Sequence, residues 1–150
     1  MKANIRNAKP GDIQEIIRLC IDHADFEKCV YSEVDKAEKL ASVLFGKSPK
    51  LYCLLAEHEG TIIGYATYML QYSTWDAGEY IYMDCLYLDE QFRGHNIGKN
   101  LINEIKAFGK SQNISHIQWQ TPEFNTRAIK FYNRLGSSSK SKERFFLDCE

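Results

Sequence analysis

The octapeptide FRGHNIGK, Phe92–Lys99, joins two stretches of the chain that have different hydrophobic patterns. Before it, Glu79–Leu88 reads EYIYMDCLYL and is rich in the aromatic and aliphatic residues of a buried strand. After it, Leu101, Ile105 and Phe108 recur at the spacing of one helix face. Glycine loses much conformational entropy on folding, so a turn that concentrates glycine and asparagine needs an unusual backbone. We therefore predict a strand, a tight turn and a helix in direct succession.

The start of the predicted helix is a candidate anion site. Backbone N–H groups in the first helical turn have no partner within the helix and carry the positive end of its dipole. They can bind phosphate oxygens, and the missing side chains at Gly94 and Gly98 would let such a ligand approach. The turn matches neither the dinucleotide motif GxGxxG nor the Walker motif GK[ST], so nucleotide hydrolysis is not indicated. The residues alone leave two interpretations open, a pyrophosphate site and an ordinary strand-to-helix turn.

Outward from this turn, hydrophobic periodicity and turn residues predict the other elements. They are a strand at 3–7, a helix from Ile13 with Asp12 and Glu15 as its capping box, a helix capped by Ser32 or Asp35 and ended by Gly46, antiparallel strands at 51–57 and 61–72, a strand at 114–121, a helix at 125–136 ended by Gly136, and a last strand at 144–148. The order βααβββαβαβ predicts a mixed α/β (α+β) fold. Its sheet should be mostly antiparallel, with one parallel strand–helix–strand unit at 79–121.

Length and composition predict one soluble globular domain over residues 1–150. Apolar residues make up 44% of the 150 and charged residues 26%, the usual globular mixture. Lysine and arginine (19) nearly balance aspartate and glutamate (20), so neither nucleic acid nor an anionic membrane is an expected partner. No apolar run is long enough for a membrane span or an export signal.

The cysteines predict a reducing compartment. There are five, an odd number, and they are scattered without a C-x-x-C pair. That pattern fits neither a disulfide framework nor a zinc site. We expect reduced thiols in a cytoplasmic protein.

The glycine-rich turn resembles part of a known enzyme site when it is taken together with a second motif. RGHNIGKNLI, the apolar strand before it, and NTRAIKFYNRLG about thirty residues later resemble the acetyl-coenzyme A site of the GNAT superfamily of N-acetyltransferases. The resemblance extends over the whole element order and is strongest from about Ile62 to Gly136. It implies a GNAT-like fold and an acetyl-CoA-dependent N-acetyltransferase that needs no metal.

The resemblance also implies where acetyl-CoA binds. In the family the loop reads Q/R-x-x-G-x-G/A, which falls on Arg93–Gly98 with Asn96 in place of the central glycine. Asparagine tolerates a left-handed backbone better than other non-glycine residues, so the loop can form. Backbone N–H groups would hold the pyrophosphate, and the edge of the strand before the loop would pair with the pantetheine arm. The implied cofactor-binding residues are Leu86, Leu88, Arg93, Gly94, His95, Asn96, Ile97, Gly98, Lys99, Asn125 and Tyr132, with the Leu86 N–H facing the thioester carbonyl.

Two residues are candidates for proton transfer. Direct attack of an amine on a thioester requires removal of the ammonium proton and protonation of the departing thiolate. Tyr132 occupies a position where GNAT enzymes often carry a tyrosine near the sulfur, and its phenol can donate a proton. Asp84 is an acid inside an otherwise apolar strand, where burial would be costly, and it could accept the amine proton through water or hold the ammonium. Without the resemblance, a packed tyrosine and a salt-bridged aspartate are the alternatives. Asn125 is also an N-cap candidate.

The acceptor is the least determined part of the prediction. Within the family, ADFEK, YSTW, MDCLYL and FYNRLG resemble the spermidine/spermine and thialysine acetyltransferases. Glu27, Trp75 and Asp84 could bind an alkyl ammonium, with Asp25 and Asp76 as further acids. The subgroup implies a homodimer. A non-catalytic acyl-CoA-binding regulatory module, or an acetyltransferase of a protein or antibiotic amine, remains an alternative.

Overall fold

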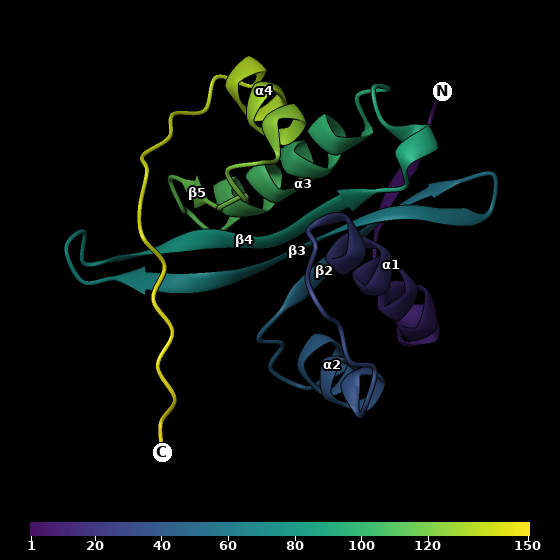
Figure 1. Cartoon of the computed structure of the whole chain (residues 1–150), viewed down its shortest axis with the longest axis horizontal. Helices are drawn as coiled ribbons and strands as arrows, with labels where there is room; N and C mark the ends of the chain where they lie inside the picture. Colours follow the sequence, from purple (N-terminus) through teal and green to yellow (C-terminus); the bar gives the residue numbers. More distant parts are fainter. The chain divides into compact units, whose positions relative to one another are not determined.

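The computed structural model describes every residue from 1 to 150 and contains nine helices and strands with two single 3-10 turns (Figure 1). Their bounds are β1 (Asn4–Asn7), α1 (Ile13–Phe26), α2 (Lys36–Phe45), β2 (Tyr52–His58), β3 (Thr61–Ser73), β4 (Gly78–Leu88), α3 (Ile97–Ser111), β5 (Ile117–Gln118) and α4 (Thr126–Arg134), with η1 at Pro10–Asp12 and η2 at Glu90–Phe92. The chain divides into two compact units, Met1–Gln120 and Thr121–Glu150.

The first unit is built on a five-stranded sheet with the order β1-β2-β3-β4-β5. The first four strands pair antiparallel in chain order, and β5 pairs parallel with β4. This confirms the predicted mixed, mostly antiparallel sheet and its parallel unit. The parallel pairing is short, because only Ile81 with Ile117 and Tyr82 with Gln118 are in register.

Helices cover both faces of this sheet (Figure 1). On one face, α1 and α2 pack on β2 and β3 around a cluster of buried residues: Ile16, Leu19, Leu44, Cys53, Leu55, Ile62 and Tyr65. On the other face lies α3, whose buried Ile97, Leu101 and Ile105 confirm the predicted helical spacing. Burying apolar side chains on both faces is what stabilises the central strands.

A β-bulge at Asp84 changes which face the side chains of β4 reach. Thr67 pairs with Cys85 and Tyr68 with Met83, so Asp84 has no partner in β3. An extra residue in one strand reverses the in-and-out alternation beyond it. Ile81 accordingly lies against Gly109 of α3, whereas Cys85 packs against the α1 side of the core. The bulge therefore turns the last part of β4 toward α1.

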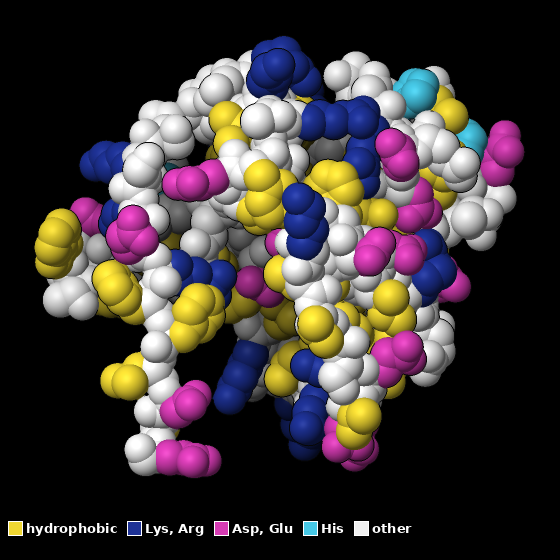
Figure 2. Space-filling model, in the orientation of Figure 1, with side chains coloured by type: hydrophobic (Ala, Val, Ile, Leu, Met, Phe, Trp, Pro, Cys, Tyr) yellow, Lys and Arg dark blue, Asp and Glu magenta, His cyan; other side chains and the backbone are white.

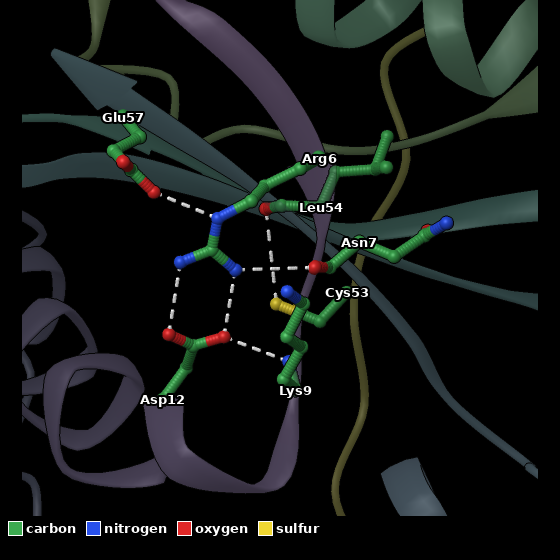
Figure 3. Close-up of polar contacts among 7 residues, drawn as sticks. All are labelled: Arg6, Asn7, Lys9, Asp12, Cys53, Leu54 and Glu57. Carbon is green, nitrogen blue, oxygen red and sulfur yellow. Dashed lines mark hydrogen bonds and ion pairs between the residues drawn. The ribbon is translucent and has the colours of Figure 1, made fainter. Parts of the chain in front are cut away.

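The turn between β1 and α1 is closed by a polar network (Figure 3). Arg6 donates to Asp12 through Nη1 (2.8 Å) and Nη2 (3.0 Å), and to Glu57 Oε2 through Nε (2.7 Å). The Asp12 carboxylate also accepts the Lys9 N–H at 2.7 Å. The helix is confirmed, but its predicted capping box with Glu15 is wrong, because the Asp12 side chain does not cap α1; it binds Arg6 and the Lys9 N–H at the start of η1 instead.

The second unit contains α4 and an irregular tail. Asn125 caps α4 as predicted, since its Oδ1 accepts the Ala128 N–H at 3.2 Å, and Gly136 ends the helix with a φ of +83°. The predicted strand at 144–148 is wrong: residues 137–150 form no regular structure. A strand needs a neighbour to pair its N–H and C=O groups, and the sheet holds no pairing for this segment. Its Phe145, Phe146 and Leu147 are exposed. The strand predicted at 114–121 is confirmed only at Ile117–Gln118.

Candidate functional site

The start of α3 presents a run of backbone N–H groups that no protein atom accepts. The Arg93 N–H bonds the Glu90 carbonyl at 3.2 Å, and the next bonded amide is that of Asn100, which donates to Asn96 at 3.0 Å. Between them, the amides of residues 94–99 have no protein acceptor, and no side chain caps the helix. Because these amides also carry the positive end of the helix dipole, the turn can bind an anion.

Two left-handed residues shape this turn. Gly94 has a φ of +85° and Asn96 a φ of +63°. The expectation that asparagine adopts the left-handed backbone here is confirmed. Gly94, His95 and Asn96 are exposed, so the turn is accessible, while Ile97 and Gly98 are buried and anchor the helix.

Arg93 ties this turn to the rest of the first unit. Its Nε donates to the Leu88 carbonyl at 2.8 Å. Its guanidinium lies 4.6 Å from the ring centroid of Phe26 and 5.3 Å from that of Tyr87. The sequence assigned Arg93 to the cofactor, and the structure engages its side chain inside the protein, where it holds the turn against β4 and α1.

The end of β4 has an open edge. The Asp89 N–H bonds the Ile63 carbonyl at 2.9 Å, and Leu88 is paired with Gly64. Together these place Leu88 in a non-hydrogen-bonded pair, so its own N–H and carbonyl point away from β3. Residues alternate along the ladder, so the N–H and carbonyl of Leu86 also point outward. Since β5 pairs only with Ile81 and Tyr82, Leu86 lies on the unpaired edge.

Asp84 is exposed rather than buried in the sheet. It lies at the bulge and forms no ion pair, so neither the burial expected from its apolar surroundings nor the alternative salt bridge is found. The Cys85 thiol donates to its Oδ2 at 3.8 Å. Cys85, the next residue, packs against the core cluster on the α1 side, and burial raises the pKa of the Cys20 thiol in α1, with the Asp84 carboxylate adding to the rise. Such an exposed carboxylate can hold an ammonium without displacing another partner.

A polar cluster lies between α1 and the last part of β4. His23 is within hydrogen-bonding distance of the Tyr65 hydroxyl at Nδ1 (3.0 Å) and of Glu27 Oε1 at Nε2 (3.1 Å). Its ring stacks on Tyr87 with centroids 5.2 Å apart. The sequence pattern indicated Glu27 as a site residue but not His23 or Tyr65. Only the i,i+4 spacing of His23 and Glu27 could have indicated the contact.

Burial keeps the neighbouring thiol and phenol protonated. It raises the pKa of Cys85 to about 12 and also raises the pKa of Tyr65. The Cys85 thiol is therefore a poor nucleophile, and it contributes to the fold by packing against the core.

Trp75 lies away from these groups within one copy of the chain. It sits in the turn between β3 and β4 and is 98% exposed. Asp76 lies in the same turn, where its Oδ2 accepts the Ser73 hydroxyl at 2.9 Å. Six strand residues from Gly78 to Asp84 span about 20 Å. The structure thus brings Glu27 and Asp84 to one region of the sheet but not Trp75.

The other predicted residues lie in the second unit. Tyr132 is in α4, two turns after the Asn125 cap, and its ring centroid is 5.3 Å from that of Phe131. Its backbone carbonyl accepts the Ser137 hydroxyl at 2.8 Å. These bonds fix the end of α4.

The remaining features bear on metals, membranes and charged partners. No three His, Cys, Asp or Glu side chains are grouped so that they could hold a metal ion. None of the helices has the length and apolar character that crossing a membrane requires. Basic and acidic side chains are both scattered over the face in Figure 2, in keeping with the net charge of −1.

Comparison with known proteins gives concordant results. The sequence profile of the acetyltransferase (GNAT) family matches residues 13–137. A thialysine N-epsilon-acetyltransferase from Bos taurus is 31% identical, with 89% of this chain and 82% of the relative covered. A spermidine/spermine N(1)-acetyltransferase-like protein from Homo sapiens is 27% identical over 93% of this chain, which spans only 21% of that protein.

Solved structures share the fold. An aminoglycoside acetyltransferase from an uncultured soil metagenomic sample matches with a TM-score of 0.83 at 18% identity, covering 99% of this chain and 97% of that one. A chain from Bacillus halodurans C-125 described as a transcriptional regulator has the same TM-score at 18% identity, covering 98% and 100%. At such identity these likenesses concern the fold alone.

Proposed function

Because the chain belongs to the acetyltransferase (GNAT) family, we propose that it transfers an acetyl group from acetyl-CoA to the primary amine of a small molecule. The observation that carries this proposal is the run of unbonded amides at residues 94–99, which directly follows a strand with an open edge. Phosphate groups can accept hydrogen bonds from such amides, and the pantetheine arm of acetyl-CoA, which contains amide groups, can pair with such a strand edge.

The residues of the turn fit the pyrophosphate of acetyl-CoA. The amides of Gly94–Lys99 would hold its phosphates, and the outward N–H of Leu86 would face the thioester carbonyl, with Leu88 further along the same edge. Acetyl-CoA supplies the activated acetyl group as a thioester. A hydrogen bond from the Leu86 N–H would stabilise negative charge on the carbonyl oxygen during attack.

Asp84 is proposed to act on the acceptor amine. Its exposed carboxylate lies at the bulge, two residues before Leu86, so it is near the point where the thioester would lie. There it would either hold the ammonium or accept its proton through a water molecule. Both roles need a carboxylate that can accept the ammonium or its proton, and the Asp84 carboxylate is available because it forms no ion pair.

Tyr132 is proposed as the general acid. Its phenol can give a proton to the departing thiolate, and Asn125 would contact the cofactor arm in addition to capping α4. This assignment requires both compact units to belong to one acetyltransferase domain over residues 1–150, and the family match from 13 to 137 supports that.

The acceptor is proposed to be a polyamine or a small amine such as thialysine. The names of the similar proteins support this class, and Glu27 with Asp84 supplies two carboxylates for a cationic acceptor. We further propose a cytoplasmic homodimer. Five free cysteines agree with a reducing compartment, and a second copy would cover the exposed Trp75 and allow it to reach an acceptor.

Release of free thiol from acetyl-CoA tests the proposal. Polyamines, thialysine, aminoglycosides and peptides are supplied in turn, and we expect the polyamines or thialysine to give the highest kcat/KM. Tyr132→Phe keeps the ring and should lower kcat about a hundredfold, while the affinity for acetyl-CoA and the Tm should change little. Binding of acetyl-CoA without thiol release for any amine would instead identify a non-catalytic acyl-CoA-binding module.

A further inference from the structure

Each ring nitrogen of His23 contacts a different side chain, one buried and neutral and the other partly exposed and acidic. Tyr65, which is 1% exposed, meets Nδ1, and Glu27, whose side chain is 31% exposed, meets Nε2. The histidine side chain itself is 14% exposed. It therefore connects a buried hydroxyl to a carboxylate at the protein surface.

These contacts determine which ring nitrogen carries the proton in the neutral histidine. An ionised Glu27 can only accept, so Nε2 must donate its N–H to Oε1. Nδ1 is then an acceptor, and the Tyr65 hydroxyl donates to it. The raised pKa of Tyr65, caused first by burial, keeps that hydroxyl protonated. Tyr65 thus fixes the tautomer that points an N–H at Glu27.

Stacking restrains the ring as well. Tyr87 packs flat against His23, with an interplanar angle of 24°, and Tyr87 in turn lies under the Arg93 guanidinium. A ring that is fixed by two hydrogen bonds and one stacking partner can hold a flexible glutamate in one place.

Glu27 and Asp84 lie along the same side of the sheet. Cys20 and His23 lie in α1 and Glu27 directly follows it on the same face, and Cys20 packs against the same buried cluster as Cys85, the residue after Asp84. The seven residue steps from Cys20 to Glu27 correspond to about 10 Å along the helix axis. If Glu27 and Asp84 are separated on this scale, their carboxylates can each bind one cationic group of an acceptor in which an alkyl chain joins the two. A carboxylate has several acceptor sites, so Glu27 can bind His23 and an ammonium together.

We propose that His23, locked by Tyr65, is a positioning residue that directs Glu27 to the second cationic group of the acceptor while Asp84 holds the reacting amine. This inference rests on the proposed function and assigns its acceptor to the diamine class. His23 itself does not touch the acceptor.

Matched acceptors test it. KM and kcat are measured at pH 8 and saturating acetyl-CoA for 1,5-diaminopentane and for pentylamine, which lacks the second cation. His23→Leu should raise KM for the diamine about tenfold, as for one lost charge-assisted contact, with kcat little changed. For pentylamine, KM should change less than about twofold. Glu27→Gln should match His23→Leu, and the double variant should add little.

Two further variants separate positioning from packing. His23→Gln keeps an N–H donor at a similar reach and should restore most of the diamine affinity. Tyr65→Phe keeps the ring but frees the tautomer, and should raise the diamine KM in the same selective way. An unchanged diamine KM in folded His23→Leu would overturn the inference, and so would equal losses for both acceptors, which would make His23 a packing residue.

A spectroscopic measurement separates this inference from the proposed function. In wild-type protein, imidazole nitrogen shifts should place the His23 proton on Nε2, and adding 1,5-diaminopentane, but not pentylamine, should move the His23 signals. A proton on Nδ1, or no response to the diamine, would contradict the inference even in an active enzyme. Absence of turnover with every amine would contradict the proposed function and leave the tautomer result to decide on His23.

Discussion

Two of the connections that carry a strand into a helix, β1 to α1 and β4 to α3, differ in whether their backbone amides are hydrogen-bonded within the protein. Between β1 and α1, Asp12 accepts the Lys9 N–H, and Arg6 fixes that carboxylate while it also binds Glu57 (Figure 3). Between β4 and α3, the amides of residues 94–99 have no protein acceptor. A closed turn stabilises the fold by itself, whereas an open one leaves polar groups for a ligand to complete. The difference separates a structural turn from a binding turn.

Closing the open turn should have the largest effect. Gly98→Asp brings a side chain and a negative charge to the amides that we assign to the pyrophosphate. Acetyl-CoA affinity measured by calorimetry should fall about a hundredfold, because an attractive helix terminus becomes repulsive to phosphate. Because Gly98 is buried, Tm is measured for the same variant, so that the loss of affinity is determined on folded protein. A folded variant with unchanged affinity would place the cofactor elsewhere.

Opening the closed turn should instead cost stability. Arg6→Met leaves two partly buried carboxylates without their cation and should lower the free energy of unfolding by about 2 kcal/mol. Lys39→Met is the matched control, since the Lys39–Asp35 pair is exposed and 3.9 Å long, and it should change the free energy by less than about 0.5 kcal/mol. Urea unfolding measures both. If the Arg6 variant lost acetyl-CoA affinity and kept its stability, the comparison of the two turns would fail.

The closed turn should also give stability a dependence on acid pH. Hydrogen bonding to Arg6 lowers the pKa of Asp12 below its ordinary value of 3.8. A lowered pKa means that the stabilisation is complete above that ordinary value and is lost as pH falls through the folded-state pKa. Between pH 5 and pH 2 the wild type should therefore lose more of its free energy of unfolding than Asp12→Asn does. If the free energies of unfolding of the two proteins changed equally with pH, the Asp12 carboxylate would contribute nothing to the pH dependence of stability.

The smallest change is expected at Asn96. Asn96→Gly restores the glycine of the family loop at a residue whose φ of +63° glycine adopts without strain. Acetyl-CoA affinity should rise by no more than about threefold, because the turn already has the required backbone. A larger gain would mean that the asparagine side chain obstructs the phosphates.

The sequence predicted the open turn better than the closed one. Glycines and asparagine with a helix pattern after them are local signals, so the backbone of residues 94–99 could be foreseen. Asp12 was mistaken for a helix cap, because its true partner Arg6 lies on another element and is brought near only by folding. The His23–Tyr65 contact was missed for the same reason, since 42 positions separate the two residues.

The bulge and the tail show the limits of hydrophobic pattern. The β4 residues on either side of Asp84 are apolar on both faces of the strand, so the reversal of alternation leaves no trace in the sequence. The exposure of Asp84 could therefore not be predicted. At 144–148 the pattern was that of a strand, but strand formation depends on a pairing partner and not on composition alone.

Amide chemical shifts during titration with acetyl-CoA test the central claim most directly. The open-turn account predicts that the amides of residues 94–99 shift strongly and become protected from exchange with solvent. The amides of Lys9 and Asp12 in the closed turn should stay unchanged. Unmoved amides at 94–99 in protein that binds acetyl-CoA would contradict the account, because the ligand would then be held by other groups.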